Sequence, residues 1–244
     1  MKSIIIKNLC IVVGVLFLAS CTNLDETLYD QVESSNFYNT RKDVERIVAR
    51  PFEHCYHMIQ YRHFLQELPS DQIITPSRDG WWDDGGCWRR YHYHTWTPQD
   101  DYFEFLWNEG FQGISQCNFG IEQLATVDRE KFGFTNEEID NYTASLRTLR
   151  ALCYISLLDG FRNLPYVVSF EDQTKNTETQ VEPSVIFRYI ENELKDVINK
   201  LPKKETLGTQ AQYLNQWTQA GAAALLARLY RFFLVFLFCK GIQF

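Results

Sequence analysis

The chain has 244 residues, of which 45% are apolar, 15% aromatic and 23% charged. This length and apolar share suit one or two domains with a buried core, and they exclude wholesale disorder. A mean hydropathy of -0.30 excludes a protein with many membrane spans. The formal net charge of -7 argues against nucleic-acid binding, because the chain has no domain-wide positive field for phosphates.

The first twenty residues have the features of an export signal. Lys2 and Lys7 give a positive start, and an apolar run follows from Leu9 to Ala19. The run is too short to span a bilayer as a mature helix and is typical of a cleaved secretory signal. It ends in Leu18-Ala19-Ser20-Cys21, which resembles the lipoprotein box of bacteria.

The lipoprotein box implies cleavage before Cys21 and lipid chains on its sulfur, which would anchor the protein to a membrane without spanning it. The alternative is an ordinary export signal in which Cys21 is incidental. The next residues, 22–26, have the sequence TNLDE. They look like the acidic leader of surface-exported lipoproteins of the Bacteroidetes, so we expect exposure at the cell surface.

The remaining cysteines do not indicate a metal or redox framework. They are Cys55, Cys87, Cys117, Cys153 and Cys239, and no two of them form a CxxC pair. Those at 117 and 153 fall on apolar helical faces, where a free cysteine behaves as a small hydrophobic residue. Export permits disulfides, but an odd number of cysteines cannot pair completely within one chain.

Hydrophobic spacing predicts an all-α fold after a polar extended stretch that reaches residue 39. Apolar residues recur every three or four positions in residues 44–59, 100–125 and 136–161, which is typical of amphipathic helices. We expect Pro51 to kink or break the first helix. Gly160 and Pro165 are expected to close the third.

Two further helices are predicted in the last third of the chain. One opens near Ser184, behind Pro183, and ends at Pro202, and the other starts near Thr218. From residue 136 onward, the order and lengths of helices and loops are typical of stacked tetratricopeptide-like pairs.

Residues 69–99 differ from the rest of the chain. They combine four tryptophans with several glycines, prolines and acidic residues, and they fit neither a helical nor a clean strand period. Only 91–96 could form a short strand. A long irregular loop of this kind is uncommon and usually functional.

Several segments together resemble the SusD/RagB family, the surface glycan-binding lipoproteins of the Bacteroidetes. The lipoprotein box precedes all of them. The matching segments are SSNFYNTRKDVERIV, LPSDQIITPSRDGWWDDGGCWRRYHYHTW, LWNEGFQGISQCNFGIEQL, SLRTLRALCYISLLDGFRNLPYVV, SVIFRYIENELKDVINKLP and QAGAAALLARLY. Each is weak alone, but as an ordered set over nearly all of residues 21–230 they are specific.

The resemblance implies a helical, non-catalytic lipoprotein of the outer membrane, built on tetratricopeptide-like pairs. Such proteins bind oligosaccharide at the cell surface and cover a SusC-like TonB-dependent transporter, which imports the glycan. No cofactor or metal is implied. The expected organisation is a lipoprotein signal peptide at 1–20, a SusD-like N-terminal helical domain at 21–230, and the aromatic loop at 69–99 within it.

The chain departs from the family at its end. Family members are roughly twice as long, and residues 231–244 form an atypical hydrophobic tail where a polar helical region is expected. We interpret this as a frameshift or truncation after about Tyr230. The alternative is a short hydrophobic anchor from Ala222 to Phe238, which Arg228 and Arg231 would make costly in a bilayer.

The aromatic loop contains the residue types that bind sugars. Tryptophan offers a flat apolar surface for the C–H face of a pyranose ring, and Asp or Arg can bond its hydroxyls directionally. We therefore predict that Trp81 and Trp82 stack on sugar rings. Polar and further aromatic contacts are expected from Arg78, Asp83, Asp84 and Trp88. The competing interpretation is that the loop packs on the helices, with its tryptophans buried and Arg78 paired with Asp79. Trp96 and Trp107 are expected in the core.

Other chemistries find weaker support. Asp83 with Asp84, or Glu67 with Asp71, could imitate the paired carboxylates of a glycosidase, but adjacent acids define no carboxyl separation. Two histidine pairs could suggest a metal site: His92 and His94 on one face of a strand, and His54 and His57 one helical turn apart. Neither pair has an evident third metal ligand. The remaining alternative is a helical scaffold that recognises a partner protein, or a non-functional fragment of the glycan binder.

Overall fold

The computed structural model describes residues 40–76, 78–79, 81–82, 84–171, 179–207 and 216–241, with side chains described as far as Arg231. All of these residues belong to one unit, Asn39–Phe244. The predicted export signal at residues 1–20, the predicted acylation site Cys21 and the predicted sugar contact Asp83 lie outside the described residues.

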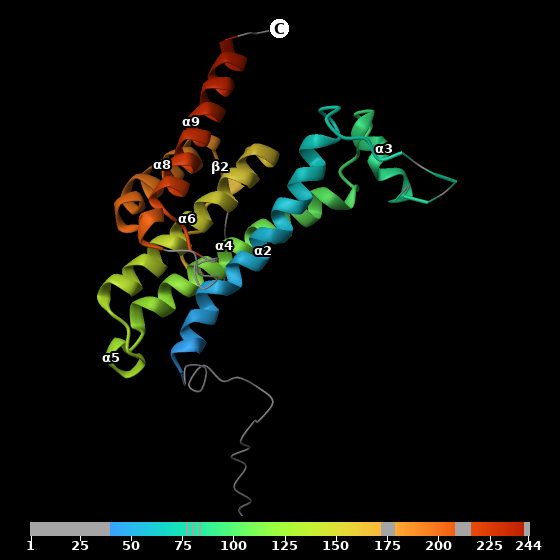
Figure 1. Cartoon of the computed structure of the whole chain (residues 1–244). Coiled ribbons are helices and arrows are strands. Elements are labelled where there is room, and N and C mark those ends of the chain that lie inside the picture. Colours follow the sequence, from blue (N-terminus) through green and yellow to red (C-terminus); the bar gives the residue numbers. More distant parts are fainter. Residues whose placement is uncertain are drawn as a thin grey trace, which may run out of the picture. The chain divides into compact units, whose positions relative to one another are not determined.

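Three long helices form the frame of this unit (Figure 1). They are α2 (Arg41–Glu67), α4 (Asp101–Thr126) and α6 (Asn136–Phe161). α4 packs along both α2 and α6. The predicted helices at 100–125 and 136–161 are therefore confirmed within one residue at each end.

Capping boxes explain where α2 and α6 begin. The backbone N–H of Thr135 donates to Oε2 of Glu138 at 2.8 Å, and the N–H of Glu138 donates to Oγ1 of Thr135 at 3.1 Å. At the start of α2, the Thr40 N–H donates to Oδ2 of Asp43 at 2.8 Å. Each box satisfies backbone donors that the first helical turn leaves without partners.

Of the kink or break predicted at Pro51, the break is wrong, because α2 continues through this residue. A proline inside a helix costs about 3 kcal/mol. Burial of one Val, Ile or Met side chain contributes about 1.5–3 kcal/mol, and the apolar face of α2 buries several. Its buried residues are Val44, Ile47, Val48, Cys55 and Met58. Gly160 likewise does not close α6, which ends at Phe161 with Arg162 at a φ of 63°.

Glycines on α4 allow the three helices to approach closely. A Cβ atom added at Gly110 would lie 2.8 Å from Leu157 of α6, and one at Gly120 would lie 2.8 Å from Leu146. Real Cβ atoms are not found at such separations, so a side chain at either glycine would force the facing leucine to move. The core consequently lies along the face that α6 presents to α4.

The C-terminal part adds a second helical layer over α6. α8 (Pro183–Val197) buries one apolar stripe at the predicted spacing, and α9 (Gln219–Gly241) packs against it. The buried residues of this layer are Ile186, Ile190, Leu194, Val197, Leu201, Ala222, Leu225 and Leu229. The predicted all-α class, with helices stacked in successive pairs, is confirmed.

A buried ionic network joins α4, α6 and α8. Arg150 donates to the Asn118 side chain at 2.5 Å and to Oε2 of Glu193 at 2.7 Å. Arg147 donates to Oε1 of the same glutamate at 2.6 Å. Asn118 is therefore buried on the otherwise apolar face of α4 because its amide oxygen has a charged partner.

Short elements complete the described fold. β1 (Leu164–Pro165) pairs antiparallel with β2 (Gln180–Val181), and this two-residue pair does not change the all-α class. α5 (Arg129–Phe132) lies between α4 and α6 in the chain. Within the described ranges, no helix combines the length and apolar character that crossing a bilayer requires.

Candidate functional site

A small aromatic cluster lies where α2 ends and α4 begins (Figure 1). Its buried centre is Leu68, Cys87 and Tyr91. Around this centre pack the partly buried residues Phe64, Leu65, Ile73, Trp88, Tyr102 and Phe103. The cluster gives residues 69–99 a local core that is built on the two frame helices.

Residues 69–99 contain helical structure that the sequence pattern did not predict. A 3-10 turn, η1 (Asp84–Gly86), leads into α3 (Cys87–His92). Positive φ values at Gly85 and Gly86, 59° and 80°, let the chain reverse there. Cys87 and Tyr91 are one helical turn apart, and both are buried in the aromatic cluster. The short strand expected at 91–96 is therefore wrong, and His92 and His94 do not share a strand face.

The two tryptophans follow a tight backbone turn. Arg78 and Trp81 exchange backbone hydrogen bonds of 3.0 and 2.8 Å, which close a tight turn that includes Asp79. Asp79 has a φ of 50°, as such tight turns require. Trp82 has a φ of 65°, which is strained for a bulky side chain. Strain of this kind is concentrated at functional sites.

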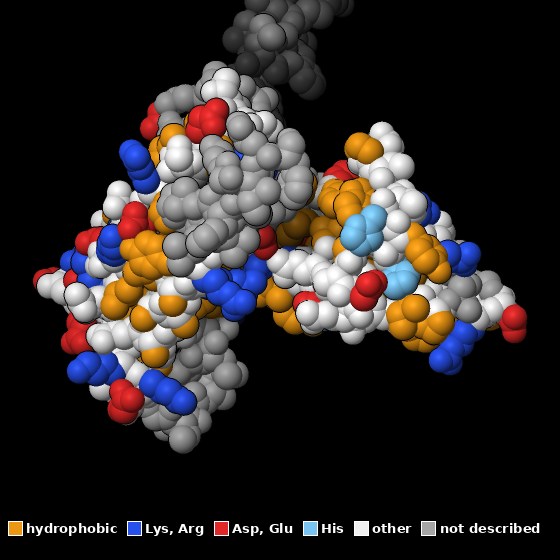
Figure 2. Space-filling model, turned by 90° about the horizontal axis from the view of Figure 1, so that it is seen from above, with side chains coloured by type: hydrophobic (Ala, Val, Ile, Leu, Met, Phe, Trp, Pro, Cys, Tyr) orange, Lys and Arg blue, Asp and Glu red, His pale blue; other side chains and the backbone are white. Residues whose placement is uncertain are grey.

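Both tryptophan side chains are presented to solvent. Trp81 is 75% exposed and Trp82 is 74% exposed, so the interpretation that buries them against the helices is wrong. Figure 2 shows exposed hydrophobic side chains gathered around the histidines of this part of the molecule. An exposed aromatic pair next to polar groups is a surface suited to a flat, amphipathic ligand.

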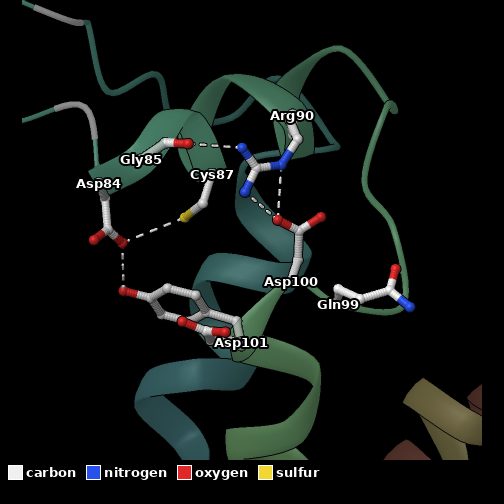
Figure 3. A pocket seen from close by; sticks show the side chains of 8 residues that line it. Asp84, Gly85, Cys87, Arg90, Gln99, Asp100 and Asp101 are labelled. Carbon is white, nitrogen blue, oxygen red and sulfur yellow. Dashed lines mark hydrogen bonds and ion pairs between the residues drawn. The ribbon is translucent and has the colours of Figure 1, made fainter.

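A cavity of about 180 Å³ adjoins η1 and α3, and polar groups dominate its wall. Figure 3 shows Arg90 between the carbonyl oxygen of Gly85, at 2.8 Å, and Oδ1 of Asp100. Across the cavity, Oδ2 of Asp84 accepts from the Cys87 thiol at 3.3 Å and from the Tyr102 hydroxyl at 3.4 Å. Gln99 and Asp101 complete the lining.

The ionisation of the cavity wall follows from these contacts. The hydrogen bond from Arg90 lowers the pKa of Asp100, and it outweighs the opposing effect of burial. Burial raises the pKa of Cys87 to about 12 and also raises the pKa of Tyr102. At neutral pH the wall therefore combines a guanidinium and an ionised carboxylate with thiol and phenol groups that keep their protons. It can donate and accept hydrogen bonds around a hydroxyl-rich ligand.

The predicted site residues fall into different environments. Arg78, Trp81 and Trp82 lie together on the exposed turn, and Asp84 faces the cavity. Trp88 instead packs inside the aromatic cluster, with its ring 4.7 Å from Phe64 and 5.1 Å from Tyr102. Because its ring faces are used by these contacts, its main role is to support the turn.

The two tryptophans predicted in the core also differ. Trp107 is half-buried and stacks near Phe111 and Phe161, with ring centroids 4.7 and 5.0 Å away. Trp96 is 40% exposed and stacks on His94 at 5.3 Å, so its placement in the core is wrong. The chain after α3 has left the helical frame at this point and cannot bury the ring.

The sequence reasoning missed the Arg90–Asp100 pair. Asp100 is the N-cap of α4, where an acidic residue is favourable. In the structure it also accepts from the backbone N–H of Thr97 at 2.7 Å. The two residues are ten apart across an irregular segment, so no helical or strand spacing relates them.

The histidine pairs have protein partners. Nδ1 of His54 lies 2.8 Å from Glu109, and Nδ1 of His92 lies 3.2 Å from Asp71. Among the residues that the structure describes, no three His, Cys, Asp or Glu side chains are grouped as metal ligands.

Comparisons by sequence and by structure both find SusD-like proteins. A SusD-like family, described as "Starch-binding associating with outer membrane", matches residues 24–231. A laminarin-binding SusD-like protein superposes with a TM-score of 0.63 at 22% identity, over 79% of this chain and 40% of its own. No curated protein sequence matches significantly.

Two further solved structures resemble this chain. A SusD-like protein from Bacteroides fragilis has a TM-score of 0.64 and 18% identity, over 81% of this chain and 36% of its own. Surface glycan-binding protein A from Bacteroides uniformis has a TM-score of 0.64 and 17% identity, over 77% of this chain and 41% of its own. The chain thus spans about two fifths of the length of these structures.

Proposed function

This chain belongs to the SusD-like family, and on that premise we propose that it captures an oligosaccharide at the cell surface without changing it chemically. The observation that carries the proposal is the pair of exposed tryptophans, Trp81 and Trp82, on a turn with strained backbone at Trp82. A solvent-exposed indole costs solubility and gains nothing for the helical frame. Its area becomes useful when a pyranose ring stacks on it.

Arg78 and Asp84 would supply the directional contacts. Arg78 borders the aromatic pair through the backbone turn, and a carboxylate oxygen of Asp84 faces the cavity. This cavity has a volume of about 180 Å³, and the charged and polar side chains around it can bond the hydroxyl groups of a sugar. We propose that one ring stacks on the tryptophans while the next unit of the chain enters this cavity.

Family membership also supports the cellular setting. We propose that the mature protein starts at Cys21, carries lipid on this residue, and lies on the outer membrane with a SusC-like TonB-dependent transporter as its partner. In this setting the glycan passes to the transporter unchanged, so the protein needs no catalytic group and no cofactor. Acyl labelling of the wild type and of Cys21→Ser tests the anchor separately from sugar binding.

The glycan proposal is tested by single substitutions at the turn. Trp81→Ala and Trp82→Ala are each compared with the wild type by affinity electrophoresis in gels that contain starch or laminarin. Tyr56→Ala is the matched control, because Tyr56 is an exposed aromatic on α2, 68% exposed and away from the turn. We expect each tryptophan variant to lose at least about tenfold in affinity. Unchanged affinity in both, with a retarded wild type, contradicts the proposal.

A protein scaffold is the second candidate, and the exposed apolar face of α2 favours it. Tyr56 and Ile59 are 68% and 48% exposed, three positions apart on one helix. Co-purification with the transporter separates the two functions. A glycan binder loses sugar affinity in the tryptophan variants and still assembles, whereas a scaffold loses assembly in Tyr56→Ala and shows no sugar affinity to lose.

A further inference from the structure

Three cysteines meet in the core where α2, α4 and α6 pack. Cys55, Cys117 and Cys153 are each at most 3% exposed. Sγ of Cys55 lies 2.9 Å from Sγ of Cys153, which is closer than two smaller, non-bonded carbon atoms at about 3.5–4.0 Å. A disulfide at about 2.0 Å needs the two sulfurs to approach by only about 0.9 Å. We propose that Cys55 and Cys153 form a disulfide that joins α2 to α6.

Gly113 of α4 leaves room for the two sulfurs to lie together. A Cβ atom at Gly113 would lie 3.0 Å from Sγ of Cys153 and 3.5 Å from Sγ of Cys55. A side chain at this position would therefore press on the Cys153 sulfur. Cys117 follows one turn later on α4, and its thiol stays as a buried neighbour of the bond. Pairing Cys55 with Cys153 leaves Cys87 and Cys117 as buried thiols among the described residues.

The bond forms by thiol–disulfide exchange during folding. The Cys55 thiolate attacks a small disulfide such as oxidised glutathione, gives a mixed disulfide and releases one glutathione thiolate. The Cys153 thiolate then attacks the Cys55 sulfur and releases the second glutathione, so two thiols are oxidised and one disulfide is reduced. In the folded chain, the hydrogen bond to Cys55 and burial raise the pKa of Cys153. Thiolate is therefore scarce after folding, and the exchange must precede the closure of α4.

Tryptic mapping provides a direct test. The full chain is reduced in denaturant, refolded in a buffer of oxidised and reduced glutathione, alkylated and digested. Trypsin places Cys55, Cys87, Cys117 and Cys153 on four different peptides, 47–62, 79–89, 91–129 and 151–162. We expect peptides 47–62 and 151–162 to be linked, about 2 Da lighter than their sum as free thiols. Alkylation of both cysteines, or a link from either one to another cysteine, overturns the proposal.

Thermal melting shows whether the bond joins the helices as described. The bond closes a loop across 98 positions of the chain, so refolding with oxidant is expected to raise Tm by about 10 °C. Cys117→Ala is the matched control, and its Tm should rise by the same amount on refolding with oxidant. Cys153→Ala loses this rise while its reduced form still melts cooperatively. Because refolding uses an added oxidant, the result is independent of export and of glycan binding. An equal rise in Cys153→Ala contradicts the proposal.

Discussion

The guanidinium of Arg90 donates two hydrogen bonds to Oδ1 of Asp100, one of them at 2.7 Å from Nε. This pair fastens the end of α3 to the start of α4, and it forms one wall of the cavity. The pair therefore adds to the Asp84–Tyr102 hydrogen bond and the aromatic cluster in holding η1 and α3 against α4.

Removal of this contact should loosen α3 while the helical frame stays intact. In Asp100→Asn, Arg90 loses its carboxylate partner and Thr97 loses a charged acceptor. We expect faster amide hydrogen exchange in residues 84–97 and unchanged exchange in α6. Asp101→Asn is the control, because Asp101 is exposed and adjacent in sequence. Equal exchange in the two variants would show that the cluster alone holds α3.

Because the backbone at Trp82 is strained, two substitutions of this residue should differ in stability but not in sugar affinity. Left-handed backbone costs a side-chain-bearing residue roughly 1–2 kcal/mol, and glycine avoids this cost. We expect urea denaturation to give Trp82→Gly a free energy of unfolding about 1 kcal/mol larger than that of Trp82→Ala. Both variants should lose sugar affinity equally. If the alanine variant proves the more stable, the positive φ of 65° does not describe the turn in solution.

The buried network of Glu193 predicts a loss of stability in acid. Burial alone would raise the pKa of this carboxyl, but hydrogen bonds and charge from Arg147 and Arg150 lower it below the usual 4.5. Because the folded pKa is the lower one, the network contributes its full stability above pH 4.5 and loses it as the pH falls through the folded pKa.

Glu193→Gln tests this pH dependence. The amide leaves Arg150 buried without a counter-charge, so we expect the free energy of unfolding at pH 7 to fall by about 3 kcal/mol. Melting curves from pH 7 down to pH 3 should then show a shallower decline than in the wild type. Parallel declines would mean that other carboxylates dominate the acid response. Glu191→Gln is the control, since that residue makes its ion pair at the surface with Lys195.

Close packing of α4 predicts opposite effects for two glycine substitutions. In Gly120→Ala the new methyl group would lie 2.8 Å from Leu146, so we expect destabilisation by about 1–3 kcal/mol. In Gly160→Ala the nearest atom is 3.4 Å away, on Leu106. There the gain in helix propensity, about 0.5–1 kcal/mol, should be realised. Denaturant midpoints measure both, and a tolerated alanine at 120 would contradict the close approach of α4 and α6.

Helical parts of the fold were predictable because they bury continuous stripes. The bounds of α6 follow from a capping box at Thr135 and an apolar period that extends to Leu157. The same reasoning failed at Pro51, because the cost of a proline inside a helix is offset by burial of the apolar face of α2, which the local sequence does not show. It also failed at α3, where a helix of one and a half turns is stabilised by residues distant in the chain.

The candidate site was predictable only in part. Exposure of Trp81 and Trp82 follows from their place behind an Asp-Gly dipeptide, and their role in sugar binding stays a prediction. Trp88 has a similar sequence context, but it lies on α3, and its ring packs against Phe64 and Tyr102. Which face of α3 is buried depends on α2 and α4, and this information is absent from the local sequence.

Because the aromatic cluster is separate from the main core, the sequence of the tryptophan turn can vary without disturbing the helical frame. Residues 69–99 rest on Leu68, Cys87 and Tyr91 and share little of the core that α6 organises. Changes in the turn therefore cost the frame almost nothing, provided that these three anchors are kept. One helical scaffold can in this way accept many different turns, and grafting the segment between related chains becomes a practical route to altered ligand preference.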